Sequence, residues 1–354
     1  MSPGPIRVLI VDDSQVTRML LAHLIEQDPS LQVAGAVGRG DQAVAFVQAS
    51  PPDVVLMDIH MDGMDGFEAT RTIMESRPVP IVMCSAVTDV HAVATAFRVY
   101  EAGAVALVEK PVGSEHPDHA RLARELLQTL RLMSEVKVVR RWARKPLSKP
   151  TLQPPAPSYG IEFVAVGAST GGPPALQTLL GGLDKDFPVP IVVVQHISAG
   201  FLPGLSEWLG QTTALQVQIA AHGIEARPGH VYLAPDDAHL AVGEKRSLRL
   251  ERGVPENGLR PAVDHLFHSV ARCCGHHAVG ILLTGMGRDG ARGLQAMHEL
   301  GATTLVQDKA SSVVFGMPGE AVALGAASQV LPLDRIADAL LRVVKPHSES
   351  RATS

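Results

Sequence analysis

A serine within a short run of small residues is the first place where this sequence could perform chemistry. Ser169 stands in Gly167-Ala-Ser-Thr-Gly171, between an apolar stretch at 161–166 and a helical pattern at 175–180. The run has the spacing G-x-S-x-G, in which small neighbours let the backbone turn sharply from strand to helix and expose the hydroxyl. The N-terminus of the helix would then point at the group that the serine attacks. The pattern indicates acyl transfer, although small residues also form ordinary tight turns or phosphate-binding loops at such positions.

A serine nucleophile needs a base and an acid that orients the base. His196 ends an apolar strand, and Asp289 lies in the glycine-rich loop that follows another. Because the carboxyl ends of parallel strands meet in one crevice, Ser169, His196 and Asp289 are predicted to lie together. His196 would accept the serine proton, and Asp289 would accept the other ring N–H and stabilise the imidazolium. The glycines at 285–290 would let backbone amides form an oxyanion hole. Against this, a histidine after a strand is commonly an ordinary polar loop residue.

A second set of reactive groups lies near the N-terminus. Asp12 and Asp13 close one predicted strand and Asp58 closes another, so three carboxylates converge and would repel one another without a cation. A hard ion with oxygen ligands, Mg²⁺, would relieve this repulsion. Ser85 and Lys110 end two further strands and supply a hydroxyl and an ammonium. One aspartate at a strand end is commonly a helix cap, but five suitable groups at four strand ends favour a phosphoryl-handling site.

The elements that position these groups alternate between strand and helix throughout the chain. In the first region the predicted strands are 7–11, 32–37, 54–57, 81–84 and 106–108, and the helices are 15–27, 41–49, 66–75, 90–102 and 118–138. In the second region the strands are 161–166, 190–196, 231–234, 248–251, 278–284 and 303–306, and the helices are 175–180, 202–208, 261–273, 293–300 and 334–344. The predicted class is α/β, with an N-terminal flavodoxin-like (βα)5 domain and a C-terminal doubly wound, mostly parallel domain.

Proline density marks the boundary between the two regions. Five prolines follow a basic run between Lys137 and Pro157, and proline at that density favours an extended backbone. We therefore predict a first domain at 1–130, a linker at 131–159 and a second domain at 160–345. The polar tail at 346–354 is predicted to be disordered.

Composition limits the classes of protein to which the chain can belong. It has 354 residues, 46% hydrophobic and 19% charged, enough for large cores and long enough to favour two domains. A net charge of -5, without a basic stretch interleaved with aromatic residues, argues against nucleic-acid binding. The N-terminal apolar run is too short to span a bilayer, so we expect a cytoplasmic protein with no direct membrane insertion. Three cysteines give no disulfide framework, and Cys273-Cys-Gly-His-His277 lacks the usual metal-ligand spacings.

Residues 5 to about 130 resemble the receiver domain of bacterial response regulators. The resemblance assigns the acidic pair, the phosphoacceptor, the hydroxyl and the lysine of that family to Asp12 and Asp13, Asp58, Ser85 and Lys110. It implies that a histidine kinase donates phosphate to Asp58 and that Mg²⁺ is required. In receivers the ion is held by the second acid of the pair, the phosphoacceptor and a main-chain carbonyl two residues later, which here are Asp13, Asp58 and His60.

Two departures from the receiver pattern affect what the resemblance implies. Where the family commonly reads Met-Pro-x-Met-Asp-Gly, this chain has Asp62 after Met61, which adds an acid near the metal site. Leu107 stands where receivers usually carry Tyr or Phe as a rotating switch. We therefore expect movement of Ser85 and of the main chain, and not rotation of an aromatic ring, to carry the effect of phosphorylation to the rest of the protein.

Residues 160–345 look like the catalytic domain of the chemotaxis receptor methylesterases. The order Ser, His, Asp differs from the Ser, Asp, His of the α/β-hydrolases, so the G-x-S-x-G spacing does not place the chain among those enzymes. The motifs that carry the resemblance are Gly167-Ala-Ser-Thr-Gly-Gly172, Val194-Gln-His196, Leu233-Ala-Pro235 and Leu283-Thr-Gly-Met-Gly-Arg-Asp-Gly290.

The second resemblance implies an activity and a role for each site residue. Ser169 would be the nucleophile, His196 the base and Asp289 the orienting acid, with the main-chain amide of Met286 as an oxyanion donor. The substrates would be glutamyl methyl esters on methyl-accepting chemoreceptors, with deamidation of receptor glutamines as a second activity and no cofactor for the esterase. Phosphorylation of the receiver would relieve blockage of the active site.

Two other classes of function stay open on the sequence. A receiver-linked binding module with an inert pocket would keep the glycine turns but would need no base. A phosphate- or nucleotide-binding domain would use the turn after Ser169 as an anion cradle, but no G-x-x-x-x-G-K-[ST] lysine follows that turn.

Overall fold

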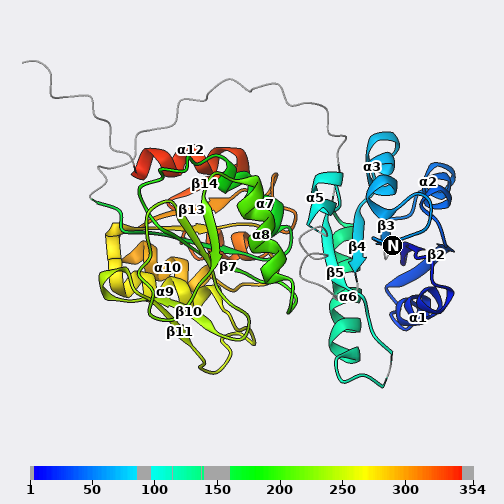
Figure 1. The fold of residues 1–354 in the computed structure, drawn as a ribbon, viewed down its shortest axis with the longest axis horizontal. Coiled ribbons are helices and arrows are strands. Elements are labelled where there is room, and N and C mark those ends of the chain that lie inside the picture. Colours follow the sequence, from blue (N-terminus) through cyan, green and yellow to red (C-terminus); the bar gives the residue numbers. More distant parts are fainter. Residues whose placement is uncertain (1–3, 86–96, 114, 137, 139–159, 345–354) are drawn as a thin grey trace, which may run out of the picture. The chain divides into compact units, whose positions relative to one another are not determined.

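The chain folds into two α/β units that divide between Ser148 and Lys149. The computed structural model describes residues 4–85, 97–113, 115–136, 138 and 160–344 (Figure 1). In both units, strands with buried side chains alternate along the chain with helices, which confirms the predicted α/β class.

The N-terminal unit is a five-stranded parallel sheet in the order β2-β1-β3-β4-β5. The strands are β1 (Ile6–Val11), β2 (Leu31–Val37), β3 (Val54–Asp58), β4 (Ile81–Ser85) and β5 (Ala106–Glu109). The helices are α1 (Gln15–Glu26), α2 (Gly40–Ala49), α3 (Gly66–Ser76), α5 (Arg98–Ala102) and α6 (His119–Ser134). Polar side chains start two of these helices, since Ser14 accepts a hydrogen bond from Thr17 N and Asp65 accepts one from Glu68 N.

The C-terminal unit is built around a seven-stranded parallel sheet in the order β14-β13-β12-β6-β7-β9-β8. Its strands are β6 (Phe163–Ala168), β7 (Ile191–Gln195), β8 (Gln216–Ile219), β9 (His230–Leu233), β12 (Ala278–Leu282), β13 (Thr303–Gln307) and β14 (Gln329–Leu331). The helices are α7 (Gly172–Gly181), α8 (Leu202–Thr212), α9 (Val263–Cys274), α10 (Ala291–Glu299), α11 (Met317–Ala323) and α12 (Leu333–Val344). A separate antiparallel pair joins β10 (His239–Val242) to β11 (Leu248–Glu251).

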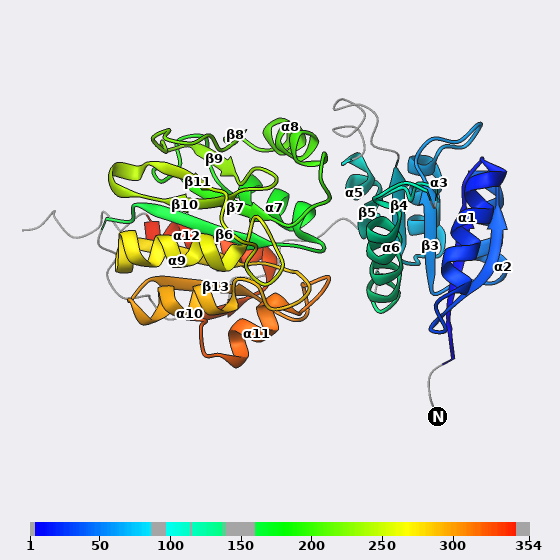
Figure 2. The same ribbon diagram turned by 90° about the horizontal axis from the view of Figure 1, so that it is seen from below.

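The helices of this unit form two groups. α7 packs with α8 and α12, and α9 packs with α10 (Figures 1 and 2). From β6 the chain crosses to β7 on one side and later reaches β12 on the other side. Because such crossovers are right-handed, the two directions place helices on opposite faces of the sheet. This is the doubly wound arrangement that the alternation predicts, and the direction of the crossovers changes beside β6, where such folds commonly bind ligands.

Several short elements were not predicted from the sequence. β8 and β14 are edge strands of four and three residues, so neither has a long apolar run. β10 pairs with the predicted strand β11 outside the main sheet. Residues 131–134 of the predicted linker form the last turn of α6. Residues 139–159, residues 90–96 of the predicted fourth helix, and the predicted disordered tail lie outside the described residues.

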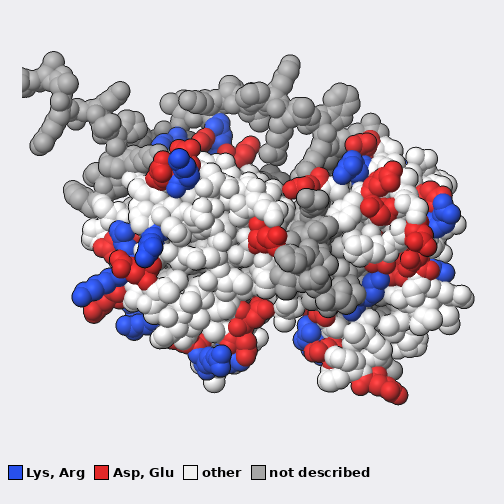
Figure 3. Space-filling model, viewed as in Figure 1, with Lys and Arg blue, Asp and Glu red and all other residues white. Residues whose placement is uncertain are grey.

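Charged side chains on the face seen in Figure 3 occur as small groups of mixed sign, and much of the C-terminal unit's face carries neither sign. Within the described part of the chain, no helix is long and apolar enough to cross a membrane.

Candidate active site and phosphorylation site

Three neighbouring strands of the C-terminal sheet bring Ser169, His196 and Asp289 to one edge. Ser169 directly follows β6 and His196 directly follows β7, while Asp289 lies in the loop after β12. The register pairs the last residues of β6 and β7, Ala168 with Gln195, and the backbone N–H of His196 donates to Ala168 O at 2.9 Å. On the other side of β6, Ser169 N donates to Thr284 O at 3.1 Å. The three strand ends that were predicted to meet are therefore adjacent in the sheet.

Ser169 occupies a tight turn between β6 and α7. Its carbonyl accepts a hydrogen bond from Gly172 N at 2.8 Å, which closes the turn at the start of the helix. Gly285 approaches it from the loop after β12, where a Cβ would lie 2.8 Å from Ser169 Cβ. A larger residue at 285 would collide with Met317 as well as with the serine, so the glycine in that loop is a steric requirement.

His196 and Asp289 form a close pair. His196 Nε2 lies 3.0 Å from Asp289 Oδ2, and the two side chains are 13% and 2% exposed. Among the described residues, no acceptor lies at the angle of a well-formed hydrogen bond to this buried nitrogen, although Asp289 is within hydrogen-bond distance. Catalytic contacts of this kind commonly tighten when substrate binds.

The Asp289 carboxylate is held by backbone amides as well as by the histidine. Oδ2 accepts from Val263 N at 2.7 Å, and Oδ1 accepts from Asp264 N and Gly290 N, both at 3.0 Å. Burial alone would raise the pKa of Asp289, but His196 and these amides hold it below its usual value. Asp289 is therefore ionised at neutral pH and suited to orient and stabilise a protonated His196.

The loop after β12 is fixed where an oxyanion hole is predicted. Gly285 N donates to Val314 O at 3.0 Å, and Gly285 O accepts from Met317 N at 2.9 Å. Met286 follows on this anchored backbone, with its residue surface 37% exposed. The role of the Met286 amide stays a prediction.

Gln195 is a supporting residue that the sequence did not reveal. Its Nε2 donates to Ser169 O at 2.8 Å and to His196 O at 2.7 Å, and the residue is only 4% exposed. One buried amide group therefore ties the turn of the nucleophile to the turn of the base. The sequence offers one sign of this role, because Gln195 is a single polar residue directly after the apolar run Ile191-Val-Val-Val194.

Buried polar groups just after β12 and at the end of β13 support the same edge of the sheet. Gln307 Oε1 accepts from Thr284 N at 2.7 Å. The Thr284 hydroxyl lies 3.0 Å from Thr170 O and accepts from Val314 N at 2.9 Å. These bonds connect the serine turn to the loop that precedes α11.

The N-terminal unit brings its five predicted site residues to the carboxyl edge of its own sheet. Lys110 Nζ lies 2.8 Å from Asp12 Oδ2 and 2.9 Å from Asp58 Oδ2. Asp12, Asp13 and Asp58 each offer an oxygen, all within 4.8 Å of one another. Ser85 ends β4, where its carbonyl accepts from Lys110 N at 2.8 Å.

The electrostatics of this site differ from those of aspartates that only cap helices. Burial raises the pKa of Asp58, and the charge of Asp12 adds to the rise, although Lys110 opposes both. Burial alone would lower the pKa of Lys110, but its two carboxylate partners hold it above the usual value. One ammonium thus serves two buried acids beside the exposed Asp13. Oxygen ligands with this excess of negative charge suit a hard divalent cation.

The remaining predicted positions lie around this cluster. His60 and Asp62 are exposed in the segment between β3 and α3, and Leu107 is half-buried on β5. Tyr100 is buried on α5, and its hydroxyl is in hydrogen-bond contact with the backbone of Leu107. An aromatic ring therefore lies next to the position where receivers usually carry one.

Comparison with known proteins gives matches in both units. Residues 164–340 match the family model described as CheB methylesterase, and residues 8–129 match that of the response regulator receiver domain. A protein-glutamate methylesterase/protein-glutamine glutaminase of Geobacter metallireducens is 51% identical over 95% of this chain and 98% of its own length. A protein of the same name from Nitrosospira multiformis is 48% identical over 98% of this chain and 99% of its own length. The crystal structure of the Thermotoga maritima CheB methylesterase catalytic domain is 38% identical, with a TM-score of 0.51, and covers 52% of this chain and all of that one.

Proposed function

The chain belongs to the CheB methylesterase family and carries a response regulator receiver domain, and from this premise we propose that it hydrolyses glutamyl methyl esters on methyl-accepting chemoreceptors. The supporting observation is the convergence of Ser169 with the His196–Asp289 pair at the ends of three neighbouring strands. We assign the receiver to the residues up to Ser134, where α6 ends, and the catalytic domain to 160–345, with the linker between them.

The first half of the proposed reaction acylates the enzyme. His196 removes the proton from Ser169 Oγ as the oxygen attacks the ester carbonyl, and the negative charge that develops is stabilised by main-chain amides that include Met286. Because Nε2 faces Asp289, Nδ1 is the ring nitrogen left to take this proton. The intermediate then expels methoxide, which His196 protonates to methanol, and an acyl-serine remains.

The second half restores the enzyme. His196 removes a proton from water as the water attacks the acyl-serine, and the serine oxygen leaves with the proton that His196 returns. Asp289 stays ionised throughout and stabilises the imidazolium in both halves. The products are methanol and a receptor glutamate.

Deamidation of glutamine follows from the same sequence of steps. Ammonia replaces methanol as the leaving group, and the acyl-serine is identical. Because an amide nitrogen leaves less readily than methoxide, we expect the ester to be the faster substrate.

The N-terminal unit supplies control. We infer that Asp58 accepts phosphate from a histidine kinase, with Lys110 and Ser85 neutralising and binding the phosphoryl oxygens. The acidic cluster fits Mg²⁺, which Asp13, Asp58 and the main-chain carbonyl of His60 would hold. When bound, the ion neutralises charge on the phosphoryl group. Phosphorylation then relieves the restraint that the receiver places on the esterase.

Mass spectrometry of receptor glutamates tests this function. A methylated receptor fragment is incubated with the full-length protein, and methanol is measured in parallel. We expect loss of the methyl mass at glutamyl esters in step with methanol release, and none with Ser169→Ala. Unchanged esters in the presence of the folded, phosphorylated protein would instead favour a binding module with an inert pocket.

A further inference from the structure

The Asp289 carboxylate rests on the first turn of α9. Two of its hydrogen bonds come from the N–H groups of Val263 and Asp264, at 2.7 and 3.0 Å. Ala262, the residue that precedes the helix, makes no capping bond through its side chain. Asp289 therefore serves as the cap of α9, although it lies in a different loop. The direction in which it faces His196 depends on where this first turn lies.

Asp264 provides the reciprocal cap. Its Oδ1 accepts a hydrogen bond from Gly293 N, in the first turn of α10, at 2.7 Å. Its Oδ2 accepts from Asn257 Nδ2 at 3.1 Å, and the residue is 4% exposed. The helices touch here, since a Cβ on Gly293 would lie 2.8 Å from Asp264 O. Asp289 thus caps α9, which carries Asp264, and Asp264 caps α10, which begins two residues after Asp289, so the pair joins α9 to α10 beside His196.

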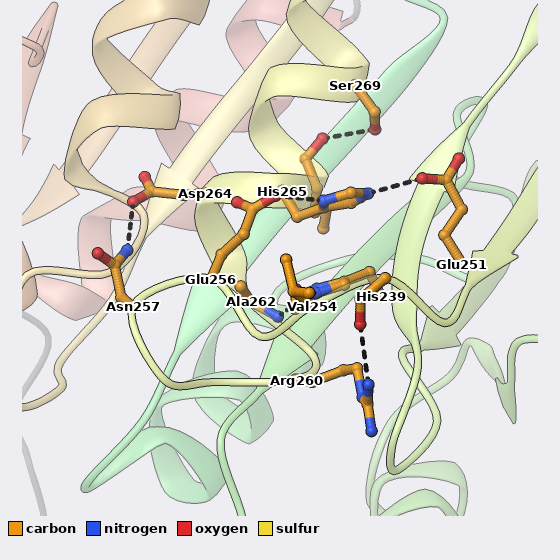
Figure 4. A network of polar contacts seen from close by, with 12 residues as sticks. His239, Glu251, Val254, Glu256, Asn257, Arg260, Ala262, Asp264, His265 and Ser269 are labelled. Carbon is orange, nitrogen blue, oxygen red and sulfur yellow. Dashed lines mark hydrogen bonds and ion pairs between the residues drawn. The ribbon is translucent and has the colours of Figure 1, made fainter.

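The segment that leads into α9 is fastened from a second direction (Figure 4). The His265 ring lies between two carboxylates. Its Nδ1 is 2.6 Å from Glu256 Oε1, and its Nε2 is 3.1 Å from Glu251 Oε2. The His239 ring stacks on it with centroids 4.3 Å apart and accepts a hydrogen bond from Ala262 N at 3.2 Å. Asp264 is therefore the link between this braced segment and α10.

Keeping a carboxylate at position 264 is electrostatically unfavourable. Burial raises the pKa of Asp264 and the charge of Asp289 adds to the rise, although the Gly293 amide and other neighbours oppose it. A buried acid kept next to another buried acid is typical of a functional requirement.

We propose that Asp264 is a positioning residue for ester hydrolysis: it fixes the first turn of α9, whose amides hold Asp289 against His196. This inference rests on the proposed function, because it gives Asp264 a task only if the triad is the reacting group. Asp264 acts through Asp289 and not on the substrate.

The first test compares Asp264→Ala with Ser269→Ala in the full-length protein. Ser269 lies on the same helix, is equally buried, and accepts a hydrogen bond from Val242 N at 3.0 Å, so its loss removes a buried bond without disturbing the first turn. With a methylated receptor fragment, Asp264→Ala lowers kcat by about 10- to 100-fold and changes KM by less than about twofold. Ser269→Ala leaves both close to the wild-type values. Equal kcat in the two variants would overturn the proposal.

A milder variant covers the case in which Asp264→Ala does not fold. Asn257 is exposed, and Asn257→Ala removes one of the two bonds that hold the Asp264 carboxylate. We expect kcat to fall by about threefold at unchanged KM. An unchanged kcat in this variant would count against the proposal.

The second test asks whether Asp264 acts through Asp289. In an Asp289→Asn background, adding Asp264→Ala lowers kcat by less than about twofold, because coupled residues are not additive. A further loss of about 10- to 100-fold would show an independent role and reject the proposal. Ser169→Ala distinguishes failure of the proposed function from failure of this inference. Turnover by that variant defeats the proposed function. An inactive Ser169→Ala together with an unaffected Asp264→Ala defeats only this inference.

Discussion

Asp58 and Asp289 are both buried carboxylates at the carboxyl edge of a parallel sheet, but their surroundings have opposite effects. Asp289 accepts three backbone hydrogen bonds and faces a histidine, and its pKa is lowered. Among the described residues, Asp58 accepts one backbone hydrogen bond, from Ile59 N at 2.8 Å, and shares Lys110 with Asp12, and its pKa is raised.

The contrast matches the work that each acid is proposed to do. An orienting acid must stay ionised and stationary, so its oxygens are saturated by fixed amides. A phosphoacceptor must present an oxygen to an incoming group and a cation, so part of its charge is left uncompensated. Aspartates at corresponding places in two α/β sheets thus differ in the amides that the described residues direct at them, and this difference suits them to two tasks.

The largest expected effect is on the nucleophile. Ser169→Ala should lower turnover by about 10⁴-fold or more while leaving the fold intact, because triad members act as a unit. His196→Ala should be comparably impaired. Methanol release assays compare both with the wild-type protein, and near-wild-type turnover by Ser169→Ala would exclude this serine as the nucleophile.

Asp289→Asn should have a smaller effect than loss of the base. It keeps a side chain of the same shape but loses the charge that stabilises His196, so we expect a fall in kcat of about 10²- to 10⁴-fold. The same assay measures it. If the variant were silent, another acid would have to orient the histidine, and Asp264 is the nearby buried candidate.

Control by the receiver should have a more modest effect. If the unphosphorylated receiver favours a restrained form by about 10:1, equivalent to roughly 1.4 kcal/mol, removing residues 1–150 should raise turnover by about tenfold. A small-molecule phosphodonor with Mg²⁺ should activate the full-length protein and fail with Asp58→Asn, and Ser85→Ala should respond weakly. A truncated enzyme no faster than its unphosphorylated parent would show that the receiver only tethers the esterase.

The smallest effects are on stability, and they should have opposite signs. The lowered pKa of Asp289 stabilises its unit above the unfolded value of about 3.9, and this contribution is lost as pH falls through the folded value. The raised pKa of Asp58 means that stability declines as pH rises from about 3.9 through the folded value. At pH 7 Asp289→Asn should therefore lower the melting temperature of its unit and Asp58→Asn should raise that of the other. Both differences should shrink in acid, and shifts of the same sign would contradict the comparison.

The sequence predicted both sheets because their central strands are continuous apolar runs, as in Ile191-Val-Val-Val. It also predicted that Ser169, His196 and Asp289 would meet, because residues that follow parallel strands share one edge. The short edge strands β8 and β14 escaped prediction since packing against a neighbour defines them more than their own composition does.

The supporting contacts of the site could not be predicted, because they join residues that are distant in sequence. Gln195 reaches back to the carbonyl of Ser169, 26 positions earlier. The backbone N–H of Asp264 donates a hydrogen bond to the Asp289 carboxylate, and the Asp264 carboxylate accepts one from Gly293 N. No local pattern marks such bonds, since each depends on how two helices and three strands pack.

The most direct test of Ser169 as the nucleophile is covalent labelling by a serine-directed fluorophosphonate, with the modified peptide identified by mass spectrometry. We expect a single adduct at Ser169 in the full-length protein, formed faster after phosphorylation and nearly abolished by His196→Ala. An adduct at another serine, or methanol release that persists when Ser169 is fully labelled, would contradict it.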